Sequence, residues 1–250
     1  KGITIPLPQM TVDVELKETN IIQERDEIIS FISEACGIND RTEININSTI
    51  PVGRGLGSSA ALSIAIARAK KLPNVREIAD KCEKFIHGNP SGIDVNQVLS
   101  DTPLLFSKKD GAIPLNFNLD SYLLIIDTGV IGITKETLKH IKQNFENYKS
   151  YIDELGEITE KVIEPLKKKA IEIVGAYMYK AHDLLQKLGV SHESNDDVVN
   201  ICKNNGALGA KLTGGGAGGC CIALSKTKEN AEKIQNELAK KGYKSWIVTV

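Results

Sequence analysis

Pro51-Val52-Gly53-Arg54-Gly55-Leu56-Gly57-Ser58-Ser59-Ala60 is the stretch that decides how this chain folds. It joins a predicted strand over residues 43–50 to a predicted helix that begins at the serines. Three closely spaced glycines allow positive backbone dihedrals and leave no side chain between the main chain and an approaching ligand. The serines stand where helix N-caps are favoured, so free N–H groups and the positive end of the helix dipole converge there. The pattern predicts a phosphate-binding loop, although an ordinary glycine-rich connection with capping serines has the same local chemistry.

Two other loop motifs do not fit this stretch. A Walker loop needs a lysine directly after its last glycine, and none follows Gly57. A serine hydrolase elbow reads Gly-x-Ser-x-Gly, which does not occur around Ser58 or Ser59. A hydrolase using Ser58, His87 and Asp94 is therefore only a remote alternative.

Composition favours small molecules as the partners of this protein. The 250 residues include 31 Lys+Arg and 32 Asp+Glu, so a formal charge of −1 offers no basic field for nucleic acid or an acidic membrane. No apolar run approaches the ~18–20 residues of a membrane span. The five cysteines, with Cys220 and Cys221 adjacent, form neither a metal motif nor a disulfide framework, and we interpret them as small core residues. We expect a cytoplasmic protein in a reducing compartment.

Hydrophobic periodicity predicts an α+β fold with segregated layers rather than alternating βαβ units. The first half is mixed and the second half is mostly helical. Strands are predicted at residues 2–16 in two pieces, 43–50, 103–106, 113–117, 122–126 and 245–250, with a strand-loop-strand around 211–224. Helices are predicted at residues 21–35, 58–67, 75–86, 135–148, 151–168, 170–188, 195–204 and 229–241.

A second motif reads Glu-Lys-Phe-Ile-His-Gly-Asn-Pro-Ser-Gly-Ile-Asp over residues 83–94. A carboxylate just past a Pro-Ser-Gly turn can face a pocket without being neutralised by a neighbour in its own helix. Asp94 is accordingly the candidate general base and Glu83 the candidate magnesium ligand. Either residue alone could instead be a surface charge or a turn residue, and we interpret His87 as structural.

A third motif, Lys-Leu-Thr-Gly-Gly-Gly-Ala-Gly-Gly-Cys, covers residues 211–220. Its glycines formally satisfy the dinucleotide fingerprint, but that fingerprint must open a helix. The residues after Gly219 are typical of a strand instead, so we expect a hairpin whose tip lets backbone approach a ligand. A merely flexible hairpin is the alternative.

Together these motifs resemble the GHMP kinase superfamily of galactokinases, homoserine, mevalonate and phosphomevalonate kinases. Pro-x-x-x-Gly-Leu-Gly-Ser-Ser-Ala resembles its second motif, the glycine hairpin its last, and His-Gly-Asn-Pro-Ser-Gly-Ile-Asp looks like the mevalonate kinases of bacteria and archaea. The resemblance implies a two-lobed α+β fold. Residues 1–120 would form an N-terminal mixed α/β lobe, similar to domain 2 of ribosomal protein S5, and residues 121–250 a helix-rich C-terminal lobe.

The resemblance also implies roles for individual residues. Asp94 would take the proton of the mevalonate hydroxyl during ATP-dependent phosphorylation to 5-phosphomevalonate, and Ser59 with Glu83 would hold Mg²⁺. Thr134 could donate a hydrogen bond to substrate, although a threonine at a helix start is more often an N-cap. The ATP phosphates would lie on Pro51, Gly53, Arg54, Gly55, Leu56, Gly57, Ser58 and Ser59, and mevalonate would contact Ser91, Gly92, Thr134, Gly214, Gly215 and Gly216.

One departure from the family is the absence of its first motif, a Gly-Lys…Gly-Glu-His segment that carries a catalytic-site lysine. We therefore expect the natural protein to be heavier than the 27.2 kDa of this sequence. Because the lysine is missing, a non-catalytic nucleotide-binding module is one alternative function. A kinase for another GHMP substrate, such as phosphomevalonate, homoserine or a sugar, is the alternative closer to our interpretation. A homodimer is common in the family, but the sequence identifies no interface.

Overall fold

The structure is a computed structural model that describes residues 1–132, 139 and 141–250. The chain forms two compact units, which are described separately. The N-terminal unit comprises residues 3–52 and 57–115, and the C-terminal unit comprises residues 1–2, 53–56 and 116–250. The division after Leu115 lies close to the predicted boundary at residue 120, but residues 53–56 of the glycine-rich loop pack with the C-terminal unit.

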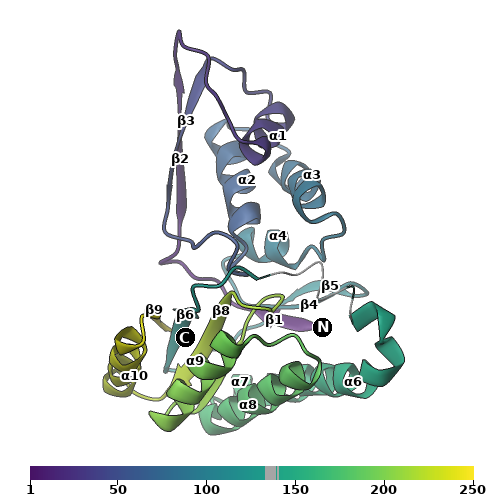
Figure 1. Ribbon diagram of the computed structural model, residues 1–250. Coiled ribbons are helices and arrows are strands. Elements are labelled where there is room, and N and C mark those ends of the chain that lie inside the picture. The colour runs from purple at the N-terminus through teal and green to yellow at the C-terminus, as the bar shows by residue number, and fades with distance from the viewer. Residues whose placement is uncertain (133–138, 140) are drawn as a thin grey trace. The chain divides into compact units, whose positions relative to one another are not determined.

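The strands of the N-terminal unit form two small sheets. Strands β2 (Val12–Glu18) and β3 (Thr42–Ser48) pair antiparallel with Val12 opposite Ser48 (Figure 1). The second sheet has the order β1 (Gly2–Thr4), β4 (Leu104–Ser107), β5 (Gly111–Pro114). The strand predicted at 113–117 begins earlier, because the tight turn after Ser107 pairs that residue with Gly111.

Four helices complete this unit: α1 (Glu27–Ala35), α2 (Ser58–Ala69), α3 (Val75–His87) and α4 (Ile93–Val98). Small and branched side chains form a hydrophobic core between three of these helices. In it, Ala60 and Ile64 of α2 pack with Ala79 of α3 and Val95 of α4. Alanine at these contacts lets helix axes approach closely. The N-termini of α2 and α4 and the buried face of α3 are thereby fixed in one rigid group.

The helix predicted at residues 21–35 is shorter than expected. It begins at Glu27 because Asp26 is its N-cap and accepts a hydrogen bond from the Ile29 N–H at 2.8 Å. Ile21 and Ile22 lie before the helix and are each 70% exposed. The prediction began too early because it followed the apolar spacing from Ile21, whereas the Asp26 side chain caps the helix and fixes its start at Glu27.

The C-terminal unit is built on one antiparallel sheet in the order β7 (Gly209–Leu212), β8 (Cys220–Ser225), β6 (Tyr122–Asp127), β9 (Lys244–Thr249). Its helices are α6 (Phe145–Lys161), α7 (Ile163–Lys167), α8 (Ile171–Lys187), α9 (Glu193–Asn204) and α10 (Lys228–Lys240) (Figure 1). The helix predicted at 151–168 is divided after Lys161 into α6 and α7, consistent with Pro165, which has no N–H for a helical hydrogen bond. The helix predicted at 135–148 falls partly outside the described residues.

The core of this unit lies between the sheet and the helices α9 and α10. Leu124 and Ile126 of β6 and Leu212 of β7 are buried against Val198 of α9 and Ile234 of α10. The α+β prediction and the predicted strand-loop-strand are both confirmed.

All five cysteines are free and buried, which confirms their interpretation as core residues. Burial raises the pKa of the Cys220 thiol to about 12. Within the described part of the chain, none of the helices has the length and apolarity required to cross a membrane.

Candidate active site

The start of α2 is an uncapped helix N-terminus. The helix begins at Ser58 as predicted, but its N-cap is Gly57 rather than a serine, with a φ of 68°. Gly57 has no side chain and makes no capping hydrogen bond, so the N–H groups of the first turn receive no acceptor from it. An anion at this helix end would meet those donors and the positive end of the dipole.

Ser59, in the first turn of α2, lies against two side chains of α3. Its Oγ donates to Oε1 of Glu83 at 2.5 Å and lies 3.3 Å from Nε2 of His87. Glu83 is only 3% exposed, and its Oε2 lies 3.7 Å from His87 Nε2. The sequence predicts Ser59 and Glu83 as a pair, and the structure brings them together with the half-exposed imidazole of His87, for which the sequence predicts a structural role.

Asp94 lies in the first turn of α4 and packs directly on the α2 N-terminus. A Cβ built on Gly57 would be 3.4 Å from Asp94 Cβ and 3.5 Å from Oδ1, so the glycine leaves the carboxyl close to the start of α2. Burial, followed by repulsion from Glu83, raises the pKa of Asp94, and His87 opposes that shift. A carboxylate whose pKa is raised is a stronger base than an ordinary aspartate, which suits it to accept a proton.

The turn before α4 holds two predicted substrate contacts. Gly92 is the N-cap of α4 with a φ of 85°, a conformation that favours glycine. The exposed Ser91 accepts the Ile93 N–H at 3.3 Å through its Oγ, so its hydroxyl is partly engaged in the turn. Thr134, the third predicted contact, lies outside the described residues.

The chemistry of Ser59 and Glu83 fits a magnesium ion. Both present oxygen, the ligand that Mg²⁺ prefers, and their two oxygens are already adjacent at 2.5 Å. Across the described residues no group of three or more His, Cys, Asp or Glu side chains could hold a metal. Mg²⁺ keeps several waters and is bound largely through substrate phosphates, so one or two protein oxygens are enough to hold it.

The other part of the loop, residues 53–56, is fixed within the C-terminal unit. The backbone carbonyl of Arg54 accepts the Cys220 N–H at 3.0 Å, and that of Gly53 accepts the Gly132 N–H at 3.3 Å. The Arg54 side chain anchors the loop to the end of β6, because its Nε lies 3.0 Å from Oδ1 of Asp127 and its Nη2 donates to the Gly129 carbonyl at 3.0 Å. Nη1 of Arg54 is buried with no hydrogen-bond partner among the described residues, which leaves this guanidinium with unused donors.

The glycine hairpin between β7 and β8 packs against the same loop. A Cβ on Gly214 would lie 2.9 Å from the Cα of Gly55, so the two backbones touch only because both residues are glycines. Gly214 and Gly215 are exposed, whereas Gly216 is buried against the carbonyl of Val190. Strand β8 follows the hairpin, which rules out the dinucleotide fingerprint and confirms the hairpin prediction.

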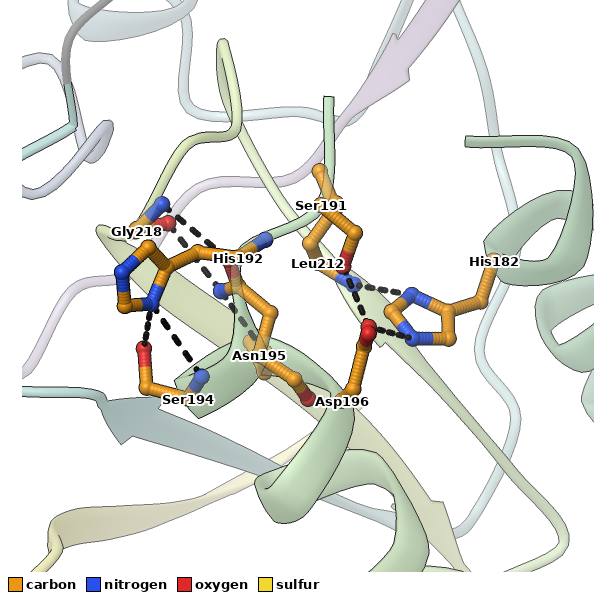
Figure 2. A network of polar contacts seen from close by, with 9 residues as sticks. His182, Ser191, His192, Ser194, Asn195, Asp196, Leu212 and Gly218 are labelled. Carbon is orange, nitrogen blue, oxygen red and sulfur yellow. Dashed lines mark hydrogen bonds and ion pairs between the residues drawn. The ribbon is translucent and has the colours of Figure 1, made fainter. Parts of the chain in front are cut away.

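A polar network behind the hairpin was not predicted from the sequence (Figure 2). Asn195, fully buried near the start of α9, contacts Gly218, and His182 of α8 lies 3.2 Å from Oδ1 of Asp196 through its Nε2. The Leu212 N–H donates to Nδ1 of His182 at 3.4 Å, and burial lowers the pKa of this histidine. An Asn near a helix start is indistinguishable from a capping residue in sequence, and His182 sits in an otherwise ordinary amphipathic helix, so no local signal marked them.

Comparison with known proteins places this arrangement in a family. The model described as GHMP kinases N terminal domain matches residues 20–100, and that described as GHMP kinases C terminal matches residues 162–244. A mevalonate kinase of Thermococcus sibiricus is 32% identical over 251 residues, covering 92% of this chain and 74% of the relative.

Solved structures agree with these matches. The crystal structure of L. major mevalonate kinase in complex with R-mevalonate has a TM-score of 0.82 at 23% identity, covering 96% of this chain and 86% of that one. The mevalonate kinase from methicillin-resistant Staphylococcus aureus MRSA252 has a TM-score of 0.71 at 26% identity, covering 95% and 86%. With both family models matched in order and a relative similar over most of its length, the chain belongs to the GHMP kinase family.

Proposed function

We propose that this protein transfers the γ-phosphoryl group of ATP to the primary hydroxyl of mevalonate, giving 5-phosphomevalonate and ADP. The similarity to mevalonate kinases over most of the chain supports the substrate. The observation that carries the chemistry is the cluster in which Asp94 packs on Gly57 while Ser59 and Glu83 share a hydrogen bond.

The glycine-rich loop and the start of α2 would bind the phosphates. Gly57 leaves the first N–H groups of α2 without a capping side chain, so they can donate to phosphate oxygens. Residues 53–56 of the loop belong to the C-terminal unit, where the ion pair between Arg54 and Asp127 holds their backbone in place. Phosphoryl transfer requires mainly alignment and charge stabilisation, and fixed backbone donors contribute to both.

Asp94 would act on the nucleophile. Its carboxylate accepts the hydroxyl proton of mevalonate as the hydroxyl oxygen bonds to the γ-phosphorus. The bond from that phosphorus to the β,γ-bridging oxygen breaks, and ADP leaves with the electron pair. The raised pKa of Asp94 makes its carboxylate a stronger base than that of an ordinary aspartate.

Ser59 and Glu83 would hold Mg²⁺, which supplies charge neutralisation at the phosphates when bound. Glu83 is suited to this role because burial keeps its carboxylate in one place, with Oε1 held by the Ser59 hydroxyl. His87 borders the pair, with its Nε2 3.7 Å from Oε2 of Glu83. The same contacts argue against a serine hydrolase, because Ser59 rather than Ser58 meets the imidazole and its hydrogen is donated to Glu83.

A substrate panel tests the proposal. The purified protein is incubated with ATP, Mg²⁺ and one of mevalonate, phosphomevalonate, homoserine or galactose, with ADP release followed by a coupled assay and the product identified by ³¹P NMR. We expect the highest kcat/KM with mevalonate, and a new phosphomonoester resonance. Preferential turnover of another acceptor would reassign the substrate, and ATP binding in calorimetry without turnover of any acceptor would identify a non-catalytic nucleotide-binding module.

A further inference from the structure

One side chain holds both backbone polar groups of a single residue in the glycine hairpin. Oδ1 of Asn195 accepts the Gly218 N–H at 3.1 Å, and Nδ2 of Asn195 donates to the Gly218 carbonyl at 3.0 Å (Figure 2). The same amide accepts the His192 N–H at 3.1 Å and donates to Sγ of Cys221 at 3.3 Å. Asn195 is completely buried, and these contacts use its two donor hydrogens and both acceptor positions of its oxygen.

The hairpin is also held by the turn that precedes α9. The Ala217 N–H donates to the Val190 carbonyl at 2.8 Å. A Cβ on Gly216 would overlap that same carbonyl oxygen, so the backbones are in direct contact. Residues 216–218 are therefore fixed against the start of α9 along their length.

The opposite side of the hairpin leads directly to the proposed phosphate loop. The Gly219 N–H donates to the Val130 carbonyl at 2.8 Å, and Oγ1 of Thr128 donates to the Gly219 carbonyl at 2.6 Å. The next residue, Cys220, donates its N–H to the carbonyl of Arg54 at 3.0 Å. A displacement of Gly218 would thus be passed through two residues to the loop at Arg54.

The backbone that Asn195 contacts has positive φ angles at two successive residues. Ala217 has a φ of 55°, and Gly218 has a φ of 113°, a region that only glycine occupies readily. Backbone in such regions persists where surrounding contacts determine it. The amide of Asn195 supplies those contacts on both sides of Gly218, at its N–H and at its carbonyl.

We propose that Asn195 is a positioning residue for phosphoryl transfer. It sets the backbone of the hairpin at residues 213–219 and, through Cys220, the backbone of the phosphate loop at Arg54. This inference rests on the proposed kinase function, since it concerns how that site is held. Asn195 itself needs no contact with substrate.

Asn195→Asp is the sharpest test, because it keeps the side-chain shape and the acceptor for the Gly218 N–H. It replaces the donor with an oxygen that faces the Gly218 carbonyl, and only the protonated carboxyl can restore that hydrogen bond. The charged and titratable groups around this position are the Asp196 carboxylate, paired with His182, the Cys221 thiol, whose pKa burial raises to about 12, and Lys211 of β7, whose own pKa burial lowers to about 8. Asp196 acts together with burial to keep the new carboxyl neutral, and Lys211 opposes them. Burial should therefore raise its pKa above that of an ordinary aspartate.

The expected readout is the ratio of variant to wild-type kcat/KM for ATP across pH. At about pH 8 we expect the ratio to fall by roughly 10–100-fold, since small misplacements of reacting groups have effects of that order. The ratio should recover as the pH is lowered to about 6, because the introduced carboxyl becomes protonated. A loss of global stability alone would not produce this recovery in protein that circular dichroism shows to be folded at every pH.

Asn230→Asp is the matched control. Nδ2 of Asn230 also donates to a glycine carbonyl, that of Gly206, at 3.0 Å, but in a turn away from the hairpin. Its ratio should stay near one at all pH values. Asn195→Ser, which removes the Gly218 contacts without burying a charge, is used if the aspartate variant does not fold, and it should show the same loss without pH dependence.

The outcomes separate this inference from the function itself. An active wild type together with an Asn195 variant of unchanged kcat/KM, or with both asparagine variants equally impaired, overturns the positioning role alone. A wild type that turns over none of the acceptors contradicts the kinase function, and the positioning role with it.

Discussion

Gly57→Ala probes the contact between the phosphate-binding helix start and the base. Gly57 has a φ of 68°, and a left-handed backbone costs an alanine about 1–2 kcal/mol. A less flexible unfolded chain offsets ~0.4–1 kcal/mol of that cost. The net loss of unfolding free energy is thus about 1 kcal/mol, or roughly 2–4 °C in Tm for a chain of this size.

The effect on activity should exceed this modest loss of stability. The new methyl group would lie 3.4 Å from Asp94 Cβ and 3.5 Å from its Oδ1, where it displaces solvent from the carboxyl. Burial is the main cause of the raised pKa of Asp94, so the methyl group should raise that pKa further. Because a base acts only when ionised, the acid limb of the kcat/KM profile should move to higher pH. We expect kcat/KM at neutral pH to fall by about 10-fold or more from this shift and from misplacement of the carboxyl.

Gly37→Ala is the control for backbone strain. Gly37 has a φ of 64° and no atom within 4 Å of a built Cβ, so it shares the dihedral cost without a contact. Melting by differential scanning fluorimetry should give similar Tm losses for the two variants, while a coupled ADP assay should detect an activity loss only for Gly57→Ala. The reasoning is refuted if Gly57→Ala keeps the wild-type profile, or if Gly37→Ala loses as much activity.

Three further changes test the surrounding contacts. Glu83→Gln weakens the proposed metal pair, so a Mg²⁺ titration of kcat should show a higher requirement that excess Mg²⁺ partly restores; an unchanged titration would contradict the ligand assignment. Asp127→Ala removes the carboxylate that pairs with Arg54 Nε, and the Arg54 side chain is only 17% exposed. The change should lower the unfolding free energy by about 2 kcal/mol and weaken ATP binding in calorimetry. A wild-type affinity for ATP would show that the Arg54–Asp127 pair does not position the loop. Burial lowers the pKa of His182, so its contribution to stability is present above the ordinary histidine value of about 6.5 and is lost as the pH falls through the lower folded pKa. In thermal melts, the Tm of His182→Gln should fall less steeply below neutral pH than the Tm of the wild type. An equal fall of Tm in the two proteins would exclude His182 as its cause.

The sequence predicted the fold class because periodicity and loop chemistry agreed over most of the chain. The start of α2 at Ser58 and the hairpin before Cys220 follow from glycines and apolar runs that are local signals. Predictions failed where a single capping or proline residue overrode periodicity, as Asp26 does before α1 and Pro165 does in the predicted helix 151–168. Each of these residues ends or begins a helix through one hydrogen bond that is gained or lost. The spacing of apolar residues does not reveal such a bond.

The candidate site was predictable in part for the same reason. Ser59, Glu83 and Asp94 lie in contiguous motifs, and the N-terminal unit brings them together. Asn195 and Asp127 act on residues that are distant in sequence, at Gly218 and Arg54, through contacts that exist only once the sheet has formed. Long-range positioning of this kind leaves no signal in a single sequence.

Asp94→Asn separates substrate binding from proton removal at the proposed base. The change keeps the shape of the side chain and removes its basicity, so both substrates should still bind while proton removal fails. We measure kcat with ATP and mevalonate together with the Kd for ATP by calorimetry. General-base assistance is worth ~10²–10⁴-fold, so kcat should fall by about that factor while the Kd changes only a few-fold and excess Mg²⁺ restores nothing. A near-normal kcat, or recovery with Mg²⁺, would contradict the account and assign Asp94 to the turn or to the metal.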